Sequence, residues 1–247
     1  MIIQTVDDRR KLYVFDAVRE LVEYAVSEFI HVAEESIGRR GSFCVALSGG
    51  STPKAFLQAL TSSERAKMLP WGAIHIFWSD ERAVAPDHTD SNYGMAMHYF
   101  AAAPFSEAHF YRMQAERSDR DLAATEYEEQ IRKIRPDGDF DIIYLGLGED
   151  GHTASLFPGS SAVNVQDRLV VATYVEAKSS WRMTFTIPLI NQAHHIVVFV
   201  VSESKASIVK QVLTSRKQPL FPAEYIGTKE TCAQFFSDRL AATLCMS

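Results

Sequence analysis

The stretch "FDIIYLGLGEDGHTASLFP", residues 140–158, joins an apolar run to a turn rich in glycine. The run at 140–145 predicts a buried β-strand that ends directly before the turn. Gly146, Gly148 and Gly151 then fit the spacing G-x-G-x-x-G, which is typical of dinucleotide-binding turns. The surrounding residues decide whether these glycines hold a nucleotide or serve another purpose.

A dinucleotide site needs a long helix after the third glycine and an acidic residue about twenty positions further on. Here Pro158 comes seven residues after Gly151 and ends any helix begun there, and the residue twenty positions beyond Gly151 is Val171. We therefore reject the dinucleotide interpretation. The turn is expected to present His152 at the carboxyl end of the strand, where open α/β sheets bind their ligands.

Strands and helices alternate on both sides of this stretch. Further strands are predicted at 43–47, 74–78, 169–175, 183–187 and 195–201. Helices are predicted from Leu12 to near Gly38, after the turn at 48–52, and at 93–101, 121–134 and 204–213. Such alternation favours an α/β fold with a mostly parallel sheet covered on both faces. Without a linker, repeat or low-complexity segment, residues 1–247 are expected to form a single domain.

The composition excludes several classes of protein. The 247 residues are 47% hydrophobic and carry a formal net charge of −6, which gives no general attraction to nucleic acid or to an anionic membrane. No signal peptide or membrane-spanning run is evident. The three cysteines lack the spacing of a zinc site or a disulfide framework. We expect a cytoplasmic protein without metal, nucleic-acid partner, membrane partner or obligate protein partner.

The segment "SGGSTPK", residues 48–54, follows the strand at 43–47 and begins a helix. Its backbone N–H groups, its hydroxyls and the positive end of the helix dipole suit a phosphate, and the candidate ligands are Gly49, Gly50, Ser51 and Thr52. The Walker A pattern is absent, and the pattern S-x-x-K is too permissive to indicate an acyl-serine enzyme. The alternative is a plain connection in which Ser51 or Thr52 caps the helix.

Basic and titratable groups occupy further strand ends. Arg82 in "SDER" could bind a phosphate or pair with Asp80 or Glu81. Arg182 and Lys205, each taken alone, also fit ordinary surface charge. An imidazole accepts a proton near neutral pH, so His152 is a candidate general base. His194 and His195 adjoin a strand without accompanying ligands and are interpreted as structural.

Four stretches together resemble the 6-phosphogluconolactonase family: "ALSGGSTP", "FWSDERAVAPDHTDSNYG", "FDIIYLGLGEDGHTASLFPGS" and "RMTFTIPLINQAHHIVVFV". The resemblance implies a Rossmann-like three-layer α/β/α fold, shared with glucosamine-6-phosphate deaminases and ribose-5-phosphate isomerases, and no cofactor. The implied reaction is hydrolysis of 6-phospho-D-glucono-1,5-lactone in the oxidative pentose phosphate pathway. The phosphate ligands implied are Gly49, Gly50, Ser51, Thr52, Arg82, Arg182 and Lys205, and the histidine of the family's "DGH" is His152.

From this we expect His152 to deprotonate the attacking water and Asp150 to orient the imidazole or the water. Arg82 or nearby backbone N–H groups would stabilise the oxyanion. The closest alternative is an aminosugar phosphate deaminase, but there an Asn-Glu-Pro sequence follows the histidine and an aromatic residue stands in place of Arg82. A sugar-phosphate sensor without catalysis would need a DNA-binding module, and the first 40 residues contain no helix-turn-helix.

Overall fold

The computed structural model describes residues 1–214 and 219–246. Among these residues, eight strands form a central sheet in the order β1-β2-β11-β10-β7-β3-β4-β6, parallel throughout except for the pair β1 and β2. The strands are β1 (Ile2–Thr5), β2 (Arg10–Phe15), β3 (Phe43–Leu47), β4 (Ile74–Trp78), β6 (His109–Phe110), β7 (Ile142–Gly146), β10 (Ile196–Val200) and β11 (Ala233–Asp238). The predicted α/β class with a mostly parallel sheet is confirmed.

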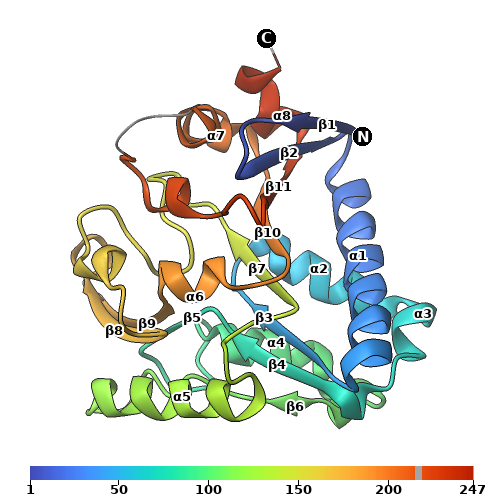
Figure 1. The fold of residues 1–247 in the computed structure, drawn as a ribbon, viewed down its shortest axis with the longest axis vertical. Helices are drawn as coiled ribbons and strands as arrows, with labels where there is room; N and C mark the ends of the chain where they lie inside the picture. Colours follow the sequence, from blue (N-terminus) through green and yellow to red (C-terminus); the bar gives the residue numbers. More distant parts are fainter. Residues whose placement is uncertain (215–218, 247) are drawn as a thin grey trace.

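Helices cover both faces of this sheet (Figure 1). Their bounds are α1 (Val18–Arg40), α2 (Ser51–Ser62), α3 (Glu64–Lys67), α4 (Asn92–Phe100), α5 (Arg120–Ile134), α6 (Ile187–Asn191), α7 (Ala206–Leu213) and α8 (Arg239–Ala242). Neighbouring strand residues belong to different cores: Ile142 and Tyr144 pack with α1, α2 and α4, whereas Ile143 and Leu145 pack with α5, α6, α7 and α8. This alternation is the reason for three layers, since successive side chains of a strand point to opposite faces.

The amino-terminal part of the chain differs from expectation. Leu12 and Phe15 were expected in the first helix, but they lie in β2, and α1 begins only at Val18. The segment Arg10–Phe15 pairs in parallel with β11 and antiparallel with β1. No strand was predicted from the sequence at either β1 or β2. Apolar residues three positions apart fit a helix in the sequence, and pairing with β11 overrides that local preference.

Three strands, which include two of the predicted ones, form a second sheet and do not join the central one. The predicted strands at 169–175 and 183–187 correspond to β8 (Val170–Val175) and β9 (Ser180–Phe185), which pair antiparallel with each other. Strand β5 (Asp80–Arg82) adds to β9, again antiparallel. Figure 1 shows β8 and β9 set apart from the central strands. The short connection between β8 and β9 permits only antiparallel pairing, because parallel strands need a long crossover.

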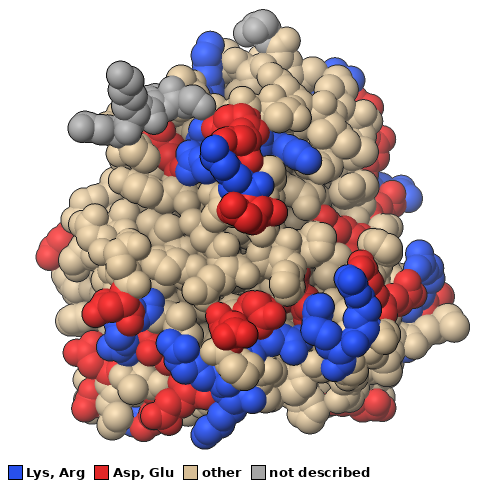
Figure 2. Space-filling view, in the orientation of Figure 1, with Lys and Arg blue, Asp and Glu red and all other residues tan. Residues whose placement is uncertain are grey.

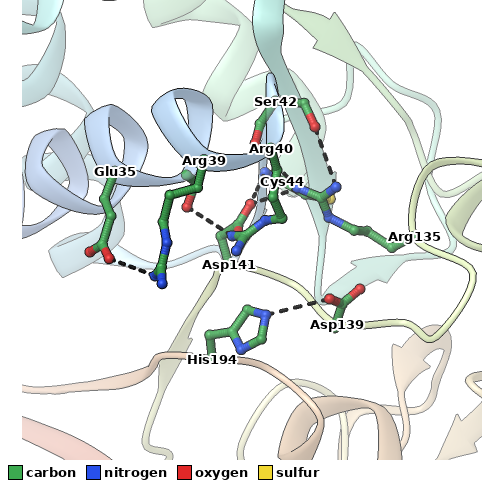
Figure 3. Close-up of polar contacts among 10 residues, drawn as sticks. Glu35, Arg39, Arg40, Ser42, Cys44, Arg135, Asp139, Asp141 and His194 are labelled. Carbon is green, nitrogen blue, oxygen red and sulfur yellow. Dashed lines mark hydrogen bonds and ion pairs between the residues drawn. The ribbon is translucent and has the colours of Figure 1, made fainter.

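The amino-terminal ends of β3 and β7 hold a buried ionic cluster (Figure 3). Asp141 directly precedes β7, is only 1% exposed, and pairs with Arg40 and with Nη2 of Arg135 at 2.9 Å. The backbone N–H of Cys44 donates to the same carboxylate at 2.6 Å. His194, interpreted from the sequence as structural, lies beside this cluster and is 3.4 Å from the Asp139 carboxylate. None of the described helices is long and apolar enough to cross a membrane.

Candidate active site

The loops that follow β3, β7 and β10 meet β5 and β9 around a cleft of about 330 Å³. The carboxyl ends of the parallel strands open into this cleft, as expected for an open α/β sheet. Eight of the predicted site residues line it: Gly49, Gly50, Ser51, Thr52, Arg82, His152, Arg182 and Lys205. The ninth, Asp150, lines a neighbouring cavity, and Phe157 contributes to both. Segments far apart in the sequence are thus brought to one place.

The glycine turn after β3 leaves the amino-terminal end of α2 open to the cleft. Gly50 is the N-cap of α2 with a φ of +115°, and no side chain caps the helix. The alternative in which Ser51 or Thr52 provides the cap is therefore wrong. A Cβ at position 49 would lie 1.8 Å from Oδ1 of Asn92, so only glycine fits there. The first-turn N–H groups have no partner within the helix, which suits an anion.

Two arginines face each other on β5 and β9. Arg82 and Arg182 are direct partners in the strand register, and the buried Nε of each has no hydrogen-bond partner among the described residues. Burial and the positive charge of Arg82 lower the pKa of Arg182. Neither guanidinium forms an ion pair within the described part of the chain. The alternative ion pair of the Arg82 guanidinium with Asp80 or Glu81 is thus wrong: Asp80 accepts from Ser155, and Glu81 accepts from the backbone N–H of Arg82 and not from its side chain.

Two lysines complete the basic lining. Lys205 ends the short helix η5 (Glu203–Lys205) after β10, and Lys178 ends η4 (Glu176–Lys178) between β8 and β9. Lys178 was not predicted, because only the pairing of β8 with β9 carries it to the cleft. Among the described residues, the lining thus holds four cations and one carboxylate, that of Asp80. In contrast, the surface in Figure 2 mixes both signs of charge. The cleft is accordingly suited to an anionic ligand.

His152 and Asp150 form a close pair at the end of β7. Nδ1 of His152 lies 2.5 Å from Oδ1 of Asp150, which also accepts from the backbone N–H of His152 at 3.1 Å. Burial opposes ionisation of Asp150, but the positive charge and the hydrogen bonds of His152 lower its pKa overall. The ring of Phe157 stacks on the imidazole with centroids 4.1 Å apart. An ionised Asp150 favours a proton on Nδ1 and leaves Nε2 free to accept one.

The three glycines at the end of β7 and in the turn after it, Gly146, Gly148 and Gly151, differ in why a side chain is absent. A Cβ at position 148 would lie 2.0 Å from Nδ1 of His152 and 2.7 Å from Oδ1 of Asp150, so Gly148 makes room for the pair. Gly151 has a φ of +78°, and a Cβ there would lie 2.5 Å from the ring of Phe221. Gly146 has no neighbour within 4 Å of its Cβ position. Two of the three glycines therefore shape the turn that carries His152.

Comparisons with known proteins agree with this geometry. The family model described as glucosamine-6-phosphate isomerases/6-phosphogluconolactonase matches residues 16–235. A 6-phosphogluconolactonase from Chlamydia muridarum is 35% identical over 224 residues, which cover 91% of this chain and 86% of that protein. One from Synechocystis is 39% identical over 199 residues, which cover 78% of this chain and 80% of that protein.

Solved structures give the same result. A 6-phosphogluconolactonase from Shewanella baltica has a TM-score of 0.82 at 27% identity, with 95% of this chain and all of that one (100%) covered. A monomeric glucosamine-6-phosphate deaminase shares the fold, with a TM-score of 0.79 at 21% identity over 94% of this chain and 99% of that one. The chain therefore belongs to the family of glucosamine-6-phosphate isomerases and 6-phosphogluconolactonases.

Proposed function

We propose that this protein hydrolyses 6-phospho-D-glucono-1,5-lactone to 6-phospho-D-gluconate in the oxidative pentose phosphate pathway, with His152 as the general base. The relatives named above as 6-phosphogluconolactonases support the substrate. The observation that carries the mechanism is the His152–Asp150 pair, with a separation of 2.5 Å, at the edge of a cleft lined by cations that form no ion pair with the described residues. We place the reaction in the cytoplasm.

The phosphate of the substrate binds at the amino-terminal end of α2. Backbone N–H groups and hydroxyls of the turn at 49–52 donate to its oxygens. Arg82, Arg182 and Lys205 balance its negative charge, and a guanidinium can donate two parallel hydrogen bonds to one phosphate. The favourable energy of this contact offsets the repulsion between two partly buried arginines that lie side by side. It also fixes the lactone ring relative to His152.

Hydrolysis then requires a water, a base and stabilisation of an oxyanion. Nε2 of His152 removes a proton from water while the water oxygen bonds to the lactone carbonyl carbon. The negative charge that develops on the carbonyl oxygen is met by Arg82 or by backbone N–H groups of the cleft. The bond from this carbon to the ring oxygen breaks, and the imidazolium returns its proton to that oxygen. Asp150 acts through His152, because it holds Nδ1.

A coupled assay with freshly made 6-phosphogluconolactone tests the proposal, once the spontaneous rate is subtracted. We expect rapid hydrolysis by the wild type and a kcat lowered by about 10²- to 10⁴-fold in His152→Ala. His31→Ala, which changes an exposed histidine on α1, is the matched control and should retain the wild-type kcat.

Two results would contradict this proposal. A wild type that does not accelerate lactone opening would remove the activity, and ammonia release from glucosamine 6-phosphate would assign the chain to the deaminase branch of the family. Unchanged turnover by a folded His152→Ala variant would instead remove only the role of His152.

A further inference from the structure

Asp80 occupies a buried position where several parts of the cleft meet. It begins β5, and its side chain is 6% exposed. Oδ2 accepts a hydrogen bond from Oγ of Ser155 at 2.7 Å, and Oδ1 accepts from Nδ2 of Asn92 at 3.3 Å. The same Asn92 amide donates to the backbone carbonyl of Asp80 at 2.9 Å. Both carboxylate oxygens therefore bond to the protein, which leaves Asp80 to act through its partners.

One partner connects Asp80 to the phosphate turn. Asn92 begins α4, and its Oδ1 lies so close to Gly49 that a Cβ there would be 1.8 Å away. The backbone N–H of Asn92 donates to Glu81 at 2.8 Å, so the amide is held from a second side. A shift of Asp80 would therefore move Asn92 and, through it, displace Gly49, since close-packed interiors transmit displacement.

The other partner connects Asp80 to the loop of the proposed base. Ser155 lies three residues after His152 and is 2% exposed. Its backbone N–H donates to Oγ1 of Thr184 at 3.1 Å, and Thr184 is the register partner of Asp80 across β5 and β9. Ala154, between His152 and Ser155, has a φ of +48°. Residues other than glycine adopt this backbone conformation only at a cost in free energy. The contacts of Ser155 hold the loop in this shape.

We infer that the hydrogen bond between Asp80 and Ser155 is a positioning device that fixes His152 relative to the phosphate turn and the arginines of β5 and β9. The inference rests on the proposed function, because it assigns Asp80 and Ser155 to the reaction of the same cleft. Substrate binding depends on the phosphate ligands, whereas turnover depends on the distance from Nε2 of His152 to the carbonyl carbon. A displacement of about 1 Å lowers turnover by about a hundredfold.

Kinetics of three variants test the inference. Ser155→Ala removes the hydroxyl donor, Asp80→Asn keeps the shape of the acceptor but removes its charge, and the third variant combines both changes. We expect Ser155→Ala to lower kcat about tenfold with KM within about twofold of wild type, which matches the loss of one buried hydrogen bond to a charged group. Asp80→Asn should lower kcat further. The loss in the double variant should be smaller than the product of the two single losses, because both changes act on the same bond.

Ser160→Ala is the matched control. This serine lies on the same loop, but its hydroxyl bonds Thr173 at 3.1 Å and caps η3 (Ser161–Asn164), so kcat and KM should be those of wild type. Urea unfolding of each variant shows whether a lower kcat is due to loss of folded protein. If Asp80→Asn does not fold, Ser155→Ala alone tests the inference.

Several results would overturn the inference while wild-type activity stands. They are an unchanged kcat in folded Ser155→Ala, a loss confined to KM, and losses in the two single variants that multiply in the double variant. An inactive wild type would instead remove the proposed function itself.

Discussion

The amino-terminal end of the central sheet and the cleft beside its carboxyl end carry charged groups in opposite arrangements. At the amino-terminal ends of β3 and β7, Asp141 is surrounded by its own partners, Arg40, Arg135 and the N–H of Cys44. At the carboxyl ends, Arg82 and Arg182 face each other, and neither forms an ion pair with a described residue. The first cluster is fully paired among the described residues, whereas the two guanidiniums of the second form no ion pair with them, although the carboxylates of Asp80, Glu81 and Asp90 lie near Arg182.

This difference distinguishes a structural cluster from the proposed binding site. A fully bonded buried ion pair changes the stability of the folded protein little, but removing one partner lowers that stability strongly, because the other charge stays buried without compensation. Two adjacent cations repel each other, so an anionic ligand bound between them would be stabilising. Changes at the amino-terminal end should therefore alter stability and leave turnover intact. Changes in the cleft should do the reverse.

The largest expected effect is on stability. Asp141→Ala leaves Arg135 buried without its carboxylate, and we expect the free energy of unfolding to fall by about 3 to 5 kcal/mol. Urea denaturation measures this loss. The kcat per folded molecule should be unchanged, because the cluster lies at the far end of the sheet. Asp139→Ala is the control: its contact with His194 is partly exposed and should contribute less than about 1 kcal/mol.

The next effect is on substrate binding. Arg182→Met keeps the length of the partly buried stem but removes the guanidinium, so KM should rise about 10- to 100-fold, the loss expected for a hydrogen bond to a charged group. Stability should stay equal or rise, because one of two like charges is gone. Arg65→Met, which removes an exposed arginine 3.3 Å from Glu34, should change neither KM nor stability. Equal KM in both variants would contradict the assignment of the cleft arginines.

Inorganic phosphate provides a smaller test that does not depend on catalysis. At ten times its Kd, phosphate should stabilise the wild type by about 1.4 kcal/mol, seen as a higher midpoint of thermal unfolding. The increment should persist in Asp139→Ala and shrink in Arg182→Met. A phosphate-induced increment of the same size in both variants would place the anion elsewhere on the protein.

The smallest effect concerns Glu28 on α1, another buried charge without a full set of partners. Burial raises its pKa from 4.5 to about 7, opposed by a hydrogen bond from Gln234, and its Oε2 has no partner among the described residues. Because the folded pKa is raised, the wild type loses stability as pH rises from about 4.5 through 7. Glu28→Gln should therefore be more stable than wild type at pH 8 and equal to it at pH 4. Equal unfolding curves at pH 8 would contradict the raised pKa.

Local patterns were sufficient for much of the fold. The runs at 74–78 and 140–145 are apolar enough to form buried strands in any arrangement, and β4 and β7 lie there. A helix follows the glycine turn as predicted, although it begins already at Ser51, since glycine and proline act on the backbone locally. Leu12 and Phe15 were misplaced because their spacing fits a helix as well as a strand, and only the edge of the sheet at β11 distinguishes the two.

The sequence by itself determined which residues stand at the ends of strands, and hence that His152 and the turn at 49–52 could share one edge of a sheet. The tertiary structure alone decided that Arg182 lies opposite Arg82, that Lys178 reaches the cleft, and that Asp80 bonds Ser155. The physical reason is the range of the interactions. Backbone propensity and hydrophobic period act over a few neighbouring residues, whereas the pairing of β5 with β9 joins segments about a hundred positions apart and depends on the burial achieved by the whole chain.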